Sequence, residues 1–368
     1  MASTAQFVTN DYSEKRELFS ERVMQSVIGA FDVFTIYLGD RLGYYQALKK
    51  QGALTSQELA AHTGTSERYA REWLEQQAAA AILEVEEPVE APGMRKFRLP
   101  LGHDEVLADH ESLNYFAPMT QLFAGAVSPI RDLIAAFRTG NGIPFERYGP
   151  DLRDGQAGVN RAMFLQQLGP EWLAAIPDLP RRLEGDPPAR VADIGCGVGW
   201  SSIGIARHYP KVLVDGFDMD PSSIDLAQTY AKQYGVSDRV GFQCRDAGDS
   251  SLAGTYDLIV ALECVHDMPN PVEALRNMRR LVREDGFVLV VDERVSEQFR
   301  PDAGDIERLM YGWSVLHCLP SGMTCDGVGT GTVMRPATLQ RYARAAGFKE
   351  IEILPVDHIF FRFYRLVF

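Results

Sequence analysis

Apolar residues recur at helical spacing near the start of the chain. They follow one another at intervals of three or four positions: Val23, Val27, Phe31, Phe34 and Leu38. Side chains at this spacing lie on one face of an α-helix. The pattern therefore predicts a long N-terminal helix over about residues 16–50, interrupted at Gly43.

The next segment has the pattern helix, turn, helix, followed by two short strands. Thr55, followed three residues later by Glu58, is typical of a capping box and starts a short helix within residues 53–62. A second helix follows a GTS turn, and residues 81–85 and 96–99 favour strands on either side of an APG turn. This order is that of a winged helix, which binds DNA in some proteins and joins two subunits in others.

Charge disfavours DNA as the partner of this winged helix. The second helix of the pair and the approach to the wing carry many carboxylates, which would repel phosphates: Glu67, Glu72, Glu75, Glu84, Glu86, Glu87 and Glu90. The basic residues of the region reduce this excess without reversing it: Arg68, Arg71, Arg95, Lys96 and Arg98. We therefore expect the winged helix to form a homodimer.

Helical patterns continue through residues 112–180, most clearly at 122–137 and 159–176. Residues 140–151 form a polar loop rich in glycine and proline, and this region could cover an active site. Residues 180–190, dense in proline and charge, indicate a linker. We divide the chain into a winged-helix dimerisation domain (1–110), a helical lid and linker (111–187) and a third domain (188–368).

Strands and helices alternate in the third domain. Short β-branched runs end at Gly195, Asp218, Cys244, Leu262 and Glu293, and each of the first four is followed by a turn, a loop or a helix. This alternation predicts an α/β fold with a parallel sheet and helices on both faces. Such sheets bind ligands beyond the carboxyl ends of their strands.

The turn after the first of these strands predicts a nucleotide site. It contains Asp193 and three alternating glycines, Gly195, Gly197 and Gly199, and the second strand ends at Asp218. Glycines allow a ligand to approach the backbone closely, and a carboxylate can accept hydrogen bonds from ribose hydroxyls. An NAD site is disfavoured because its fingerprint requires glycine where this chain has Trp200.

The D-x-G-x-G-x-G turn and the ribose acid resemble those of class I S-adenosylmethionine-dependent methyltransferases, over residues 188–368. The resemblance implies a Rossmann-like sheet of seven strands, closed by an antiparallel hairpin in residues 349–368, and S-adenosylmethionine as cofactor. It also implies cofactor-binding roles: Asp193 and the Gly195–Gly199 backbone for the methionine portion, Asp218 for the ribose, and Met219, Asp246 and Ala247 for the adenine. A glycine turn with helix-capping aspartates is the purely structural alternative, which explains Asp220 before Pro221 well.

Residues 260–271, VALECVHDMPNP, end the fourth strand of this sheet, next to the first. His266-Asp267 resembles the signature of small-molecule O-methyltransferases that carry a winged-helix dimerisation domain, in which the histidine is the general base. A base that titrates near neutrality can remove the proton of an attacking hydroxyl. Asp267 or Glu263 could hold the imidazole tautomer, and Glu263 could instead meet the amino group of the cofactor.

Several alternatives stay open around this signature. The family has tryptophan where this chain has Met268, and His266 could simply cap the following helix. His317 and Cys318 could line an acceptor pocket or pack in the core. Cys325 lies nearby, but no spacing demands a metal, and we assign none. Residues 329–336 and 360–366 also resemble a bacterial group of winged-helix methyltransferases.

Composition limits the kinds of partner and the cellular compartment that we expect for the protein. The formal net charge of −13 disfavours phosphate backbones and anionic membranes. Five scattered cysteines without a C-x-x-C pair suggest a reducing compartment, and no stretch is apolar enough to span a membrane. We therefore expect a cytoplasmic protein.

These patterns together predict an enzyme that methylates an oxygen of a small, hydrophobic or aromatic molecule. Transfer to carbon or nitrogen is the alternative within that class. A regulator that senses the cofactor and uses residues 50–100 on DNA is the alternative from another class. The patterns do not identify the acceptor.

Overall fold

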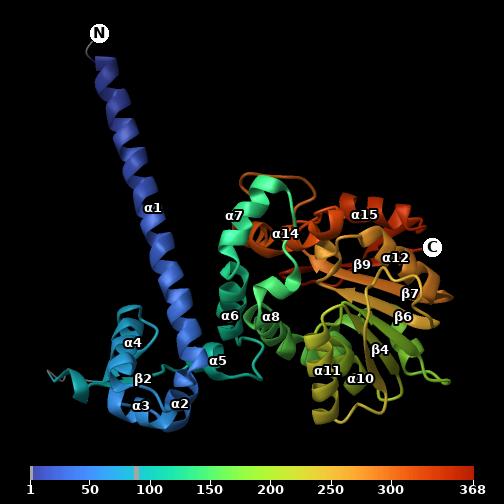
Figure 1. The fold of residues 1–368 in the computed structure, drawn as a ribbon, viewed down its shortest axis with the longest axis horizontal. Coiled ribbons are helices and arrows are strands. Elements are labelled where there is room, and N and C mark those ends of the chain that lie inside the picture. The colour runs from blue at the N-terminus through green and yellow to red at the C-terminus, as the bar shows by residue number, and fades with distance from the viewer. Residues whose placement is uncertain (1–2, 87–90) are drawn as a thin grey trace. The chain divides into compact units, whose positions relative to one another are not determined.

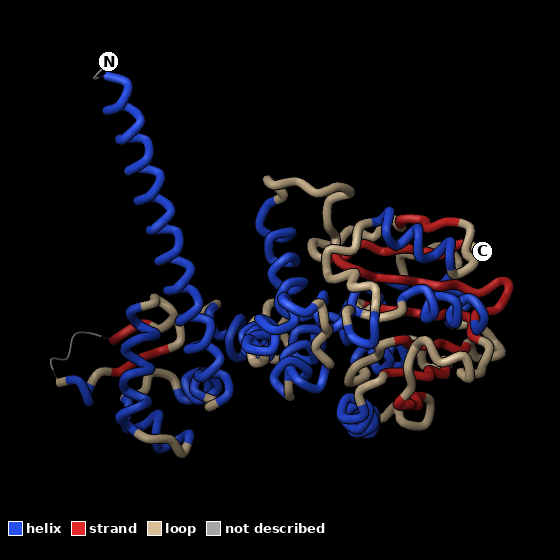
Figure 2. Tube along the Cα trace, turned by 45° about the horizontal axis from the view of Figure 1, so that its top comes forward, coloured by secondary structure: helices blue, strands red, loops and turns tan. Residues whose placement is uncertain are grey.

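The computed structural model describes residues 3–86 and 91–368. These residues form two compact units, and the boundary between the units lies between residues 124 and 125 (Figures 1 and 2). Two of the carboxylates that disfavour DNA, Glu87 and Glu90, lie outside the described residues. The division into three parts stays a prediction. Among the described residues, no helix is both long enough and apolar enough to cross a membrane.

The first unit is the predicted winged helix with its long N-terminal helix. Its elements are α1 (Ser3–Arg41), α2 (Tyr44–Gln51), α3 (Ser56–Thr63), α4 (Glu67–Ala79), β1 (Glu84–Glu86), the 3-10 turn Pro92–Met94, β2 (Lys96–Arg98), α5 (His103–Ala108) and the start of α6 (Ala117–Val127). The capping box is present, since Thr55 Oγ1 accepts from the Glu58 backbone and the Thr55 N–H donates to Glu58 Oε2. The first wing strand begins later than predicted, because Ala81 has a φ of 56° in the preceding turn.

Aromatic packing holds the helices of this unit together. Trp73 of α4 meets the rings of Tyr44 and Tyr45 edge to face, and all three side chains are buried. An isolated β-bridge joins Leu54 to Phe97 of the wing. The N-terminal part of α1 contributes little to this core, since the Phe19 and Phe31 side chains are about two-thirds exposed.

The second unit contains a seven-stranded sheet in the order β5-β4-β3-β6-β7-β9-β8. Its strands are β3 (Arg190–Ile194), β4 (Leu213–Asp218), β5 (Val240–Cys244), β6 (Tyr256–Leu262), β7 (Val282–Glu293), β8 (Glu350–Ile353) and β9 (Phe361–Val367). The first five run parallel, and β9 runs antiparallel to both of its neighbours. The predicted α/β fold, the closing hairpin and the pairing of the fourth strand with the first are confirmed.

Alternate residues of the strands pack into two hydrophobic layers, one on each face of the sheet. In β6, Leu258, Val260 and Leu262 pack in one layer, while Ile259 and Ala261 pack in the other. The first layer includes residues of α10 (Trp200–His208) and α11 (Pro221–Gln233), and the second includes residues of α12 (Pro271–Leu281) and α15 (Pro336–Ala345). Because both faces are covered, β6 is buried along its whole length.

The remaining helices of the unit occupy the regions predicted to be helical or irregular. They are α7 (Ile130–Thr139), α8 (Pro150–Met163), a π-helical segment (Phe164–Leu173), α9 (Leu179–Leu183), α13 (Gly304–Trp313), a π-helical segment (Ser314–Cys318) and α14 (Leu319–Gly322), with 3-10 turns at Phe145–Tyr148, Val265–Asp267 and Thr324–Asp326. Within the predicted linker, α9 packs in the second unit, since Leu179 and Leu183 are buried in its core.

Candidate functional site

The glycine turn joins β3 to α10 at the carboxyl edge of the sheet. Gly195, Gly197 and Gly199 all have positive φ, at 70°, 52° and 85°. A Cβ at Gly195 would lie 2.8 Å from the Cys264 side chain, and one at Gly199 would lie 2.6 Å from the Phe242 ring, so packing requires both glycines. At Gly197 no described atom lies within 4 Å of that position, so the middle glycine faces open space.

Two aspartates that were predicted to bind the cofactor also stabilise this turn through hydrogen bonds. The Asp193 carboxylate is buried, and its Oδ2 accepts hydrogen bonds of 2.6 Å from the hydroxyls of both Ser201 and Ser202. Burial raises the pKa of Asp193 to about 6, against the lowering effect of these hydroxyls. Asp218 Oδ2 accepts from the Gly197 N–H at 2.8 Å, so the strand end and the turn are joined directly.

Asp218 and Asp220 have different roles at the end of β4. Asp218 Oδ1 accepts from the Asp220 N–H at 2.9 Å, and burial raises the pKa of Asp218. Asp220 caps α11, since its carboxylate accepts from the Ser223 N–H. Asp220 is therefore the helix-capping aspartate that the purely structural alternative predicted. The Asp218 carboxylate instead lies at the carboxyl edge of the sheet. Met219, between the two, is 63% exposed.

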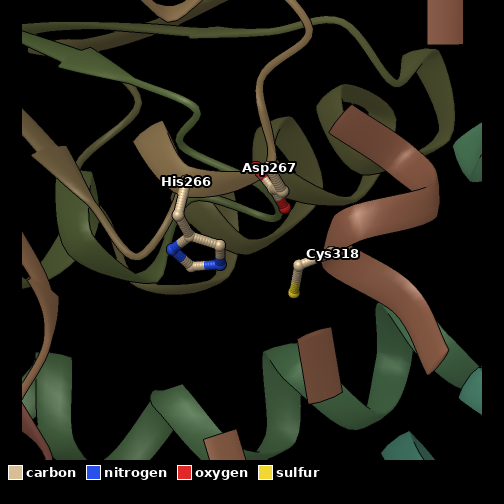
Figure 3. A group of neighbouring side chains, drawn as sticks. All are labelled: His266, Asp267 and Cys318. Atoms are coloured by element: carbon tan, nitrogen blue, oxygen red, sulfur yellow. The ribbon is translucent and has the colours of Figure 1, made fainter. Parts of the chain in front are cut away.

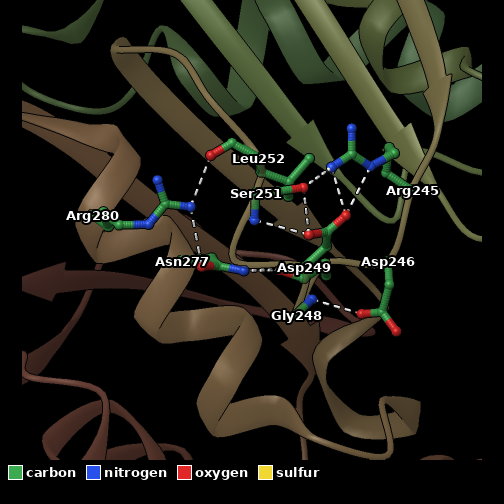
Figure 4. A network of polar contacts seen from close by, with 9 residues as sticks. Arg245, Asp246, Gly248, Asp249, Ser251, Leu252, Asn277 and Arg280 are labelled. Atoms are coloured by element: carbon green, nitrogen blue, oxygen red, sulfur yellow. Dashed lines mark hydrogen bonds and ion pairs between the residues drawn. The ribbon is translucent and has the colours of Figure 1, made fainter.

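The loop after β5 is held by a network of side chains (Figure 4). Arg245 binds Asp249, and Asp246 Oδ1 accepts from the Gly248 N–H. From α12, Asn277 Nδ2 donates a 2.8 Å hydrogen bond to the Ala247 carbonyl. The loop therefore presents Asp246, which is exposed, from a backbone anchored at both sides.

His266 lies in the 3-10 turn Val265–Asp267 that follows β6, and it is 3% exposed. Its Nδ1 lies 2.9 Å from Asp292 Oδ1 and 3.0 Å from Glu293 Oε2, at the end of β7. The expectation that Asp267 or Glu263 would hold the tautomer is replaced by these two acids, because neighbouring strands bring their ends together. Among the described residues, α12 has no side-chain N-cap, so His266 does not cap it.

The acids around His266 set its charge. Burial alone would lower the pKa of His266, but the charges of Glu293 and Asp292 outweigh this and raise that pKa well above its usual range. Burial raises the pKa of Glu263 to about 8 and that of Glu293 to about 7. The buried Oε1 of Glu263 and the buried Oδ2 of Asp292 have no hydrogen-bond partner among the described residues.

Helix α8 supplies residues that the sequence reasoning missed. Gln156 Nε2 donates to Glu263 Oε2 at 3.2 Å, and the buried Oδ1 of Asn160 has no hydrogen-bond partner in the described chain. Arg153 lies 3.9 Å from the Asp220 carboxylate. The available signal was the spacing of polar residues at 153, 156 and 160, which places them on one helical face.

On the other side of the imidazole lie Asp267 and Cys318 (Figure 3). One ligand atom from each of His266, Asp267 and Cys318 lies within 4.8 Å of the others. His317 meets the Tyr148 ring edge to face at 4.6 Å, and burial lowers the pKa of His317 to about 3. Cys318 is therefore beside His266, His317 packs among aromatic rings, and Cys325 is exposed.

The residues of the carboxyl edge fit S-adenosylmethionine. The missing side chain at Gly197 leaves open space for a close approach to the backbone. Asp218 is oriented by two backbone N–H groups and keeps lone pairs for ribose hydroxyls. The unpartnered Glu263 Oε1 can accept a hydrogen bond from an ammonium group.

Comparison with protein families gives two matches. Residues 164–353 match the model of a methyltransferase domain. Residues 30–109 match the model of an Rv2258c-like winged HTH domain. The two matches fall in the sheet region and in the winged helix, respectively.

Individual proteins are similar over parts of the chain. The ubiquinone biosynthesis O-methyltransferase of Coxiella burnetii is 27% identical over 169 residues, which cover 46% of this chain and 67% of that protein. The trans-aconitate 2-methyltransferase of Streptomyces avermitilis is 35% identical over 105 residues, which cover 28% of this chain and 37% of that protein.

Solved structures share the fold over nearly the full length. Human N-acetylserotonin methyltransferase in complex with S-adenosylmethionine aligns with a TM-score of 0.70 at 17% identity, covering 95% of this chain and 97% of that chain. Mitomycin 7-O-methyltransferase aligns with a TM-score of 0.69 at 18% identity, covering 96% and 100%. At this identity the likeness is one of fold.

Proposed function

Because the chain belongs to the methyltransferase domain family, whose model matches residues 164–353, we propose that it methylates an oxygen atom of a small molecule, with His266 as general base. The chain is an S-adenosylmethionine-dependent methyltransferase.

The contact between His266 and Asp292 is the main support for His266 as general base. Its Nδ1 lies 2.9 Å from a buried carboxylate oxygen of Asp292. A carboxylate at this distance favours the tautomer that carries a proton on Nδ1, and this leaves the lone pair of Nε2 available. A buried imidazole with a free Nε2 lone pair is suited to accept a proton from a hydroxyl.

The chain's own residues then account for the proton and the orientation. Bound S-adenosylmethionine supplies a methyl group that its positive sulfur has already activated. His266 accepts the proton of the acceptor hydroxyl at Nε2 while the oxygen attacks. Asp292 and Glu293 stabilise the imidazolium that results, because each lies within 3.0 Å of Nδ1. Asp267 lies beside the same ring nitrogen as Cys318 and would position the hydroxyl.

The cofactor-binding residues of this proposal are those that the sequence singled out. The turn residues Asp193, Gly195, Gly197 and Gly199 would hold the methionine portion, and Glu263 the ammonium group. Asp218 would bind the ribose, while Met219, Asp246 and Ala247 would surround the adenine.

Oxygen is favoured as the acceptor atom for a chemical reason. An amine held in a site with several carboxylates would keep its proton and lose its nucleophilic lone pair, whereas a hydroxyl needs only the base that His266 offers. One matched protein, the ubiquinone biosynthesis O-methyltransferase, supports oxygen by its name. A matched norajmaline N-methyltransferase keeps nitrogen as the alternative. We propose a hydrophobic or aromatic hydroxyl compound.

The proposal also includes a homodimer and a cytoplasmic location. The exposed apolar residues of α1 are placed to pack against a second copy of the chain: Phe19, Val23, Val27, Phe31, Phe34 and Leu38. The location rests on the scattered free cysteines.

The base is tested by His266→Ala, with transfer of labelled methyl groups to a panel of phenols as the measurement. We expect turnover to fall roughly a hundredfold or more, because general-base catalysis contributes about that much. Calorimetry should show unchanged binding of S-adenosylmethionine. His208→Ala, which replaces an exposed histidine of α10, is the control. Equal turnover of His266→Ala and the wild type would refute the role.

A further inference from the structure

The side of His266 that faces the acceptor also has the composition of a metal site. We propose that His266, Asp267 and Cys318 bind a soft divalent cation, Zn²⁺, and that this cation inhibits methyl transfer by occupying Nε2. The inference goes beyond the proposed function, because it concerns a ligand that the transfer of a methyl group does not need.

The three ligand atoms are already close to one another. They lie within 4.8 Å of each other, and Figure 3 shows the Asp267 carboxylate and the Cys318 thiol on the Nε2 side of the ring. Zinc binds imidazole nitrogen, carboxylate oxygen and thiolate sulfur at about 2.0–2.3 Å, so ligand atoms of one ion lie roughly 3–4 Å apart. Small rotations of Asp267 and Cys318 would bring these atoms to that spacing.

The other ring nitrogen is arranged as in known zinc sites. A histidine that binds zinc nearly always donates its second N–H to a carboxylate, which fixes the tautomer and makes the ligand nitrogen more basic. Here Nδ1 lies 2.9 Å from Asp292 Oδ1. Nε2 therefore has its lone pair directed toward Asp267 and Cys318.

Charge and burial favour a cation over an empty site. Asp292 and Glu293 each lie within 3.0 Å of the imidazole Nδ1, and the buried Asp292 Oδ2 has no hydrogen-bond partner among the described residues. A divalent ion would compensate these negative charges where water cannot. Cys318 is 7% exposed, and because this burial raises the pKa of its thiol, the thiolate forms only when the metal binds.

The thiol selects which cation binds. Hard cations such as Mg²⁺ prefer oxygen ligands and would choose the carboxylates on the Nδ1 side, where His266, Asp292 and Glu293 form a second group of close ligand atoms. A thiolate favours Zn²⁺ or Co²⁺. Binding would release the thiol proton of Cys318 to solvent as the metal–sulfur bond forms.

Metal binding and the base role exclude each other. A cation on Nε2 uses the lone pair that must accept the hydroxyl proton. Bound Zn²⁺ would therefore inhibit methyl transfer, and a chelator would restore it.

The test is titration of metal-free protein with Co²⁺, followed by absorption spectroscopy. We expect a sulfur-to-cobalt charge-transfer band that saturates at one equivalent and that Zn²⁺ removes. Cys318→Ser should abolish the band. Cys244→Ser and Cys325→Ser, which replace exposed cysteines, should retain it. Asp292→Asn should keep the band but weaken affinity about 10–100-fold, as loss of a carboxylate behind a ligand histidine does.

The proposed binding site is overturned by either of two outcomes: no band in the wild type, or a band that survives in Cys318→Ser. Its failure is distinguishable from failure of the proposed base. Without Co²⁺ binding, loss of turnover in His266→Ala would still support the base. If Co²⁺ binds through Cys318 and added Zn²⁺ stimulates turnover, the site stands, but its inhibitory role and the base are both refuted.

Discussion

At the scale of single residues, the behaviour of this site depends on the acids that surround one buried histidine. Burial and the carboxylates of Glu293 and Asp292 act on His266 in opposite directions, and the carboxylates prevail. The imidazole is therefore protonated at a pH at which an exposed histidine would be neutral. A base must be neutral before it can act, so the same acids that stabilise the product imidazolium delay the onset of activity.

This balance predicts the pH dependence of the reaction. A raised pKa of His266 means that kcat/KM should still be rising above pH 6.5. Asp292→Asn removes one charge that raises this pKa, so the acidic limb of the profile should move to lower pH. The measurement is kcat/KM for one acceptor between pH 5 and pH 10.

Asp357→Asn is the control, because Asp357 is an exposed partner of Arg294. A limb that stays in place in Asp292→Asn, with reduced kcat alone, would show that the carboxylate only orients the ring.

At the scale of elements, the site is built from the segments that follow parallel strands and from the helices that hold them. The loop after β5 is an example. It contains Asp246 and Ala247, and α12 holds it through Asn277, which is 7% exposed, and through Arg280, which donates to the Leu252 carbonyl (Figure 4). The helix thus fixes a backbone whose side chains are proposed to bind the adenine.

Asn277→Ala should therefore weaken cofactor binding more than it slows catalysis. A fully buried carbonyl without a partner costs about 1–3 kcal/mol, and the partly buried Ala247 carbonyl would lose a share of this, which we expect as a dissociation constant for S-adenosylmethionine raised up to about tenfold. The kcat at saturating cofactor should change less. Calorimetry and steady-state kinetics measure the two quantities.

Arg276→Ala is the matched control, since Arg276 is the preceding residue of the same helix and binds Glu273 at the surface. A lower melting temperature of Asn277→Ala with an unchanged dissociation constant would limit Asn277 to a structural role.

At the scale of the whole molecule, the two units differ in how completely they bury their apolar surface. The sheet unit has two hydrophobic layers, whereas α1 exposes a row of large apolar residues. A row of this kind in a folded chain indicates a protein partner. The proposed partner is a second copy of the chain.

Sedimentation tests this proposal. The wild type should sediment with twice the mass of one chain, and the double variant Val27→Gln, Phe31→Gln should sediment as a monomer at micromolar concentration. Leu101→Gln, which replaces a side chain that is 97% exposed elsewhere in the first unit, should remain a dimer. A monomeric wild type would contradict the proposal.

The sequence by itself determined the fold class, the winged helix and the glycine turn that is proposed to bind the cofactor. These depend on short-range patterns: the capping box at Thr55 and Glu58, the β-branched runs, and glycines whose backbone angles are needed where they stand. The family matches confirm the predicted methyltransferase domain and the predicted winged helix.

Only the tertiary structure decided which side chains meet at His266. Asp292 lies 26 positions further along the chain and Cys318 further still, while Gln156 reaches Glu263 across 107 positions. Periodicity reports which face of an element is buried, but not which side chain of another element will lie opposite. Strand order and helix packing set those distances, and with them the charge and the protonation of the histidine.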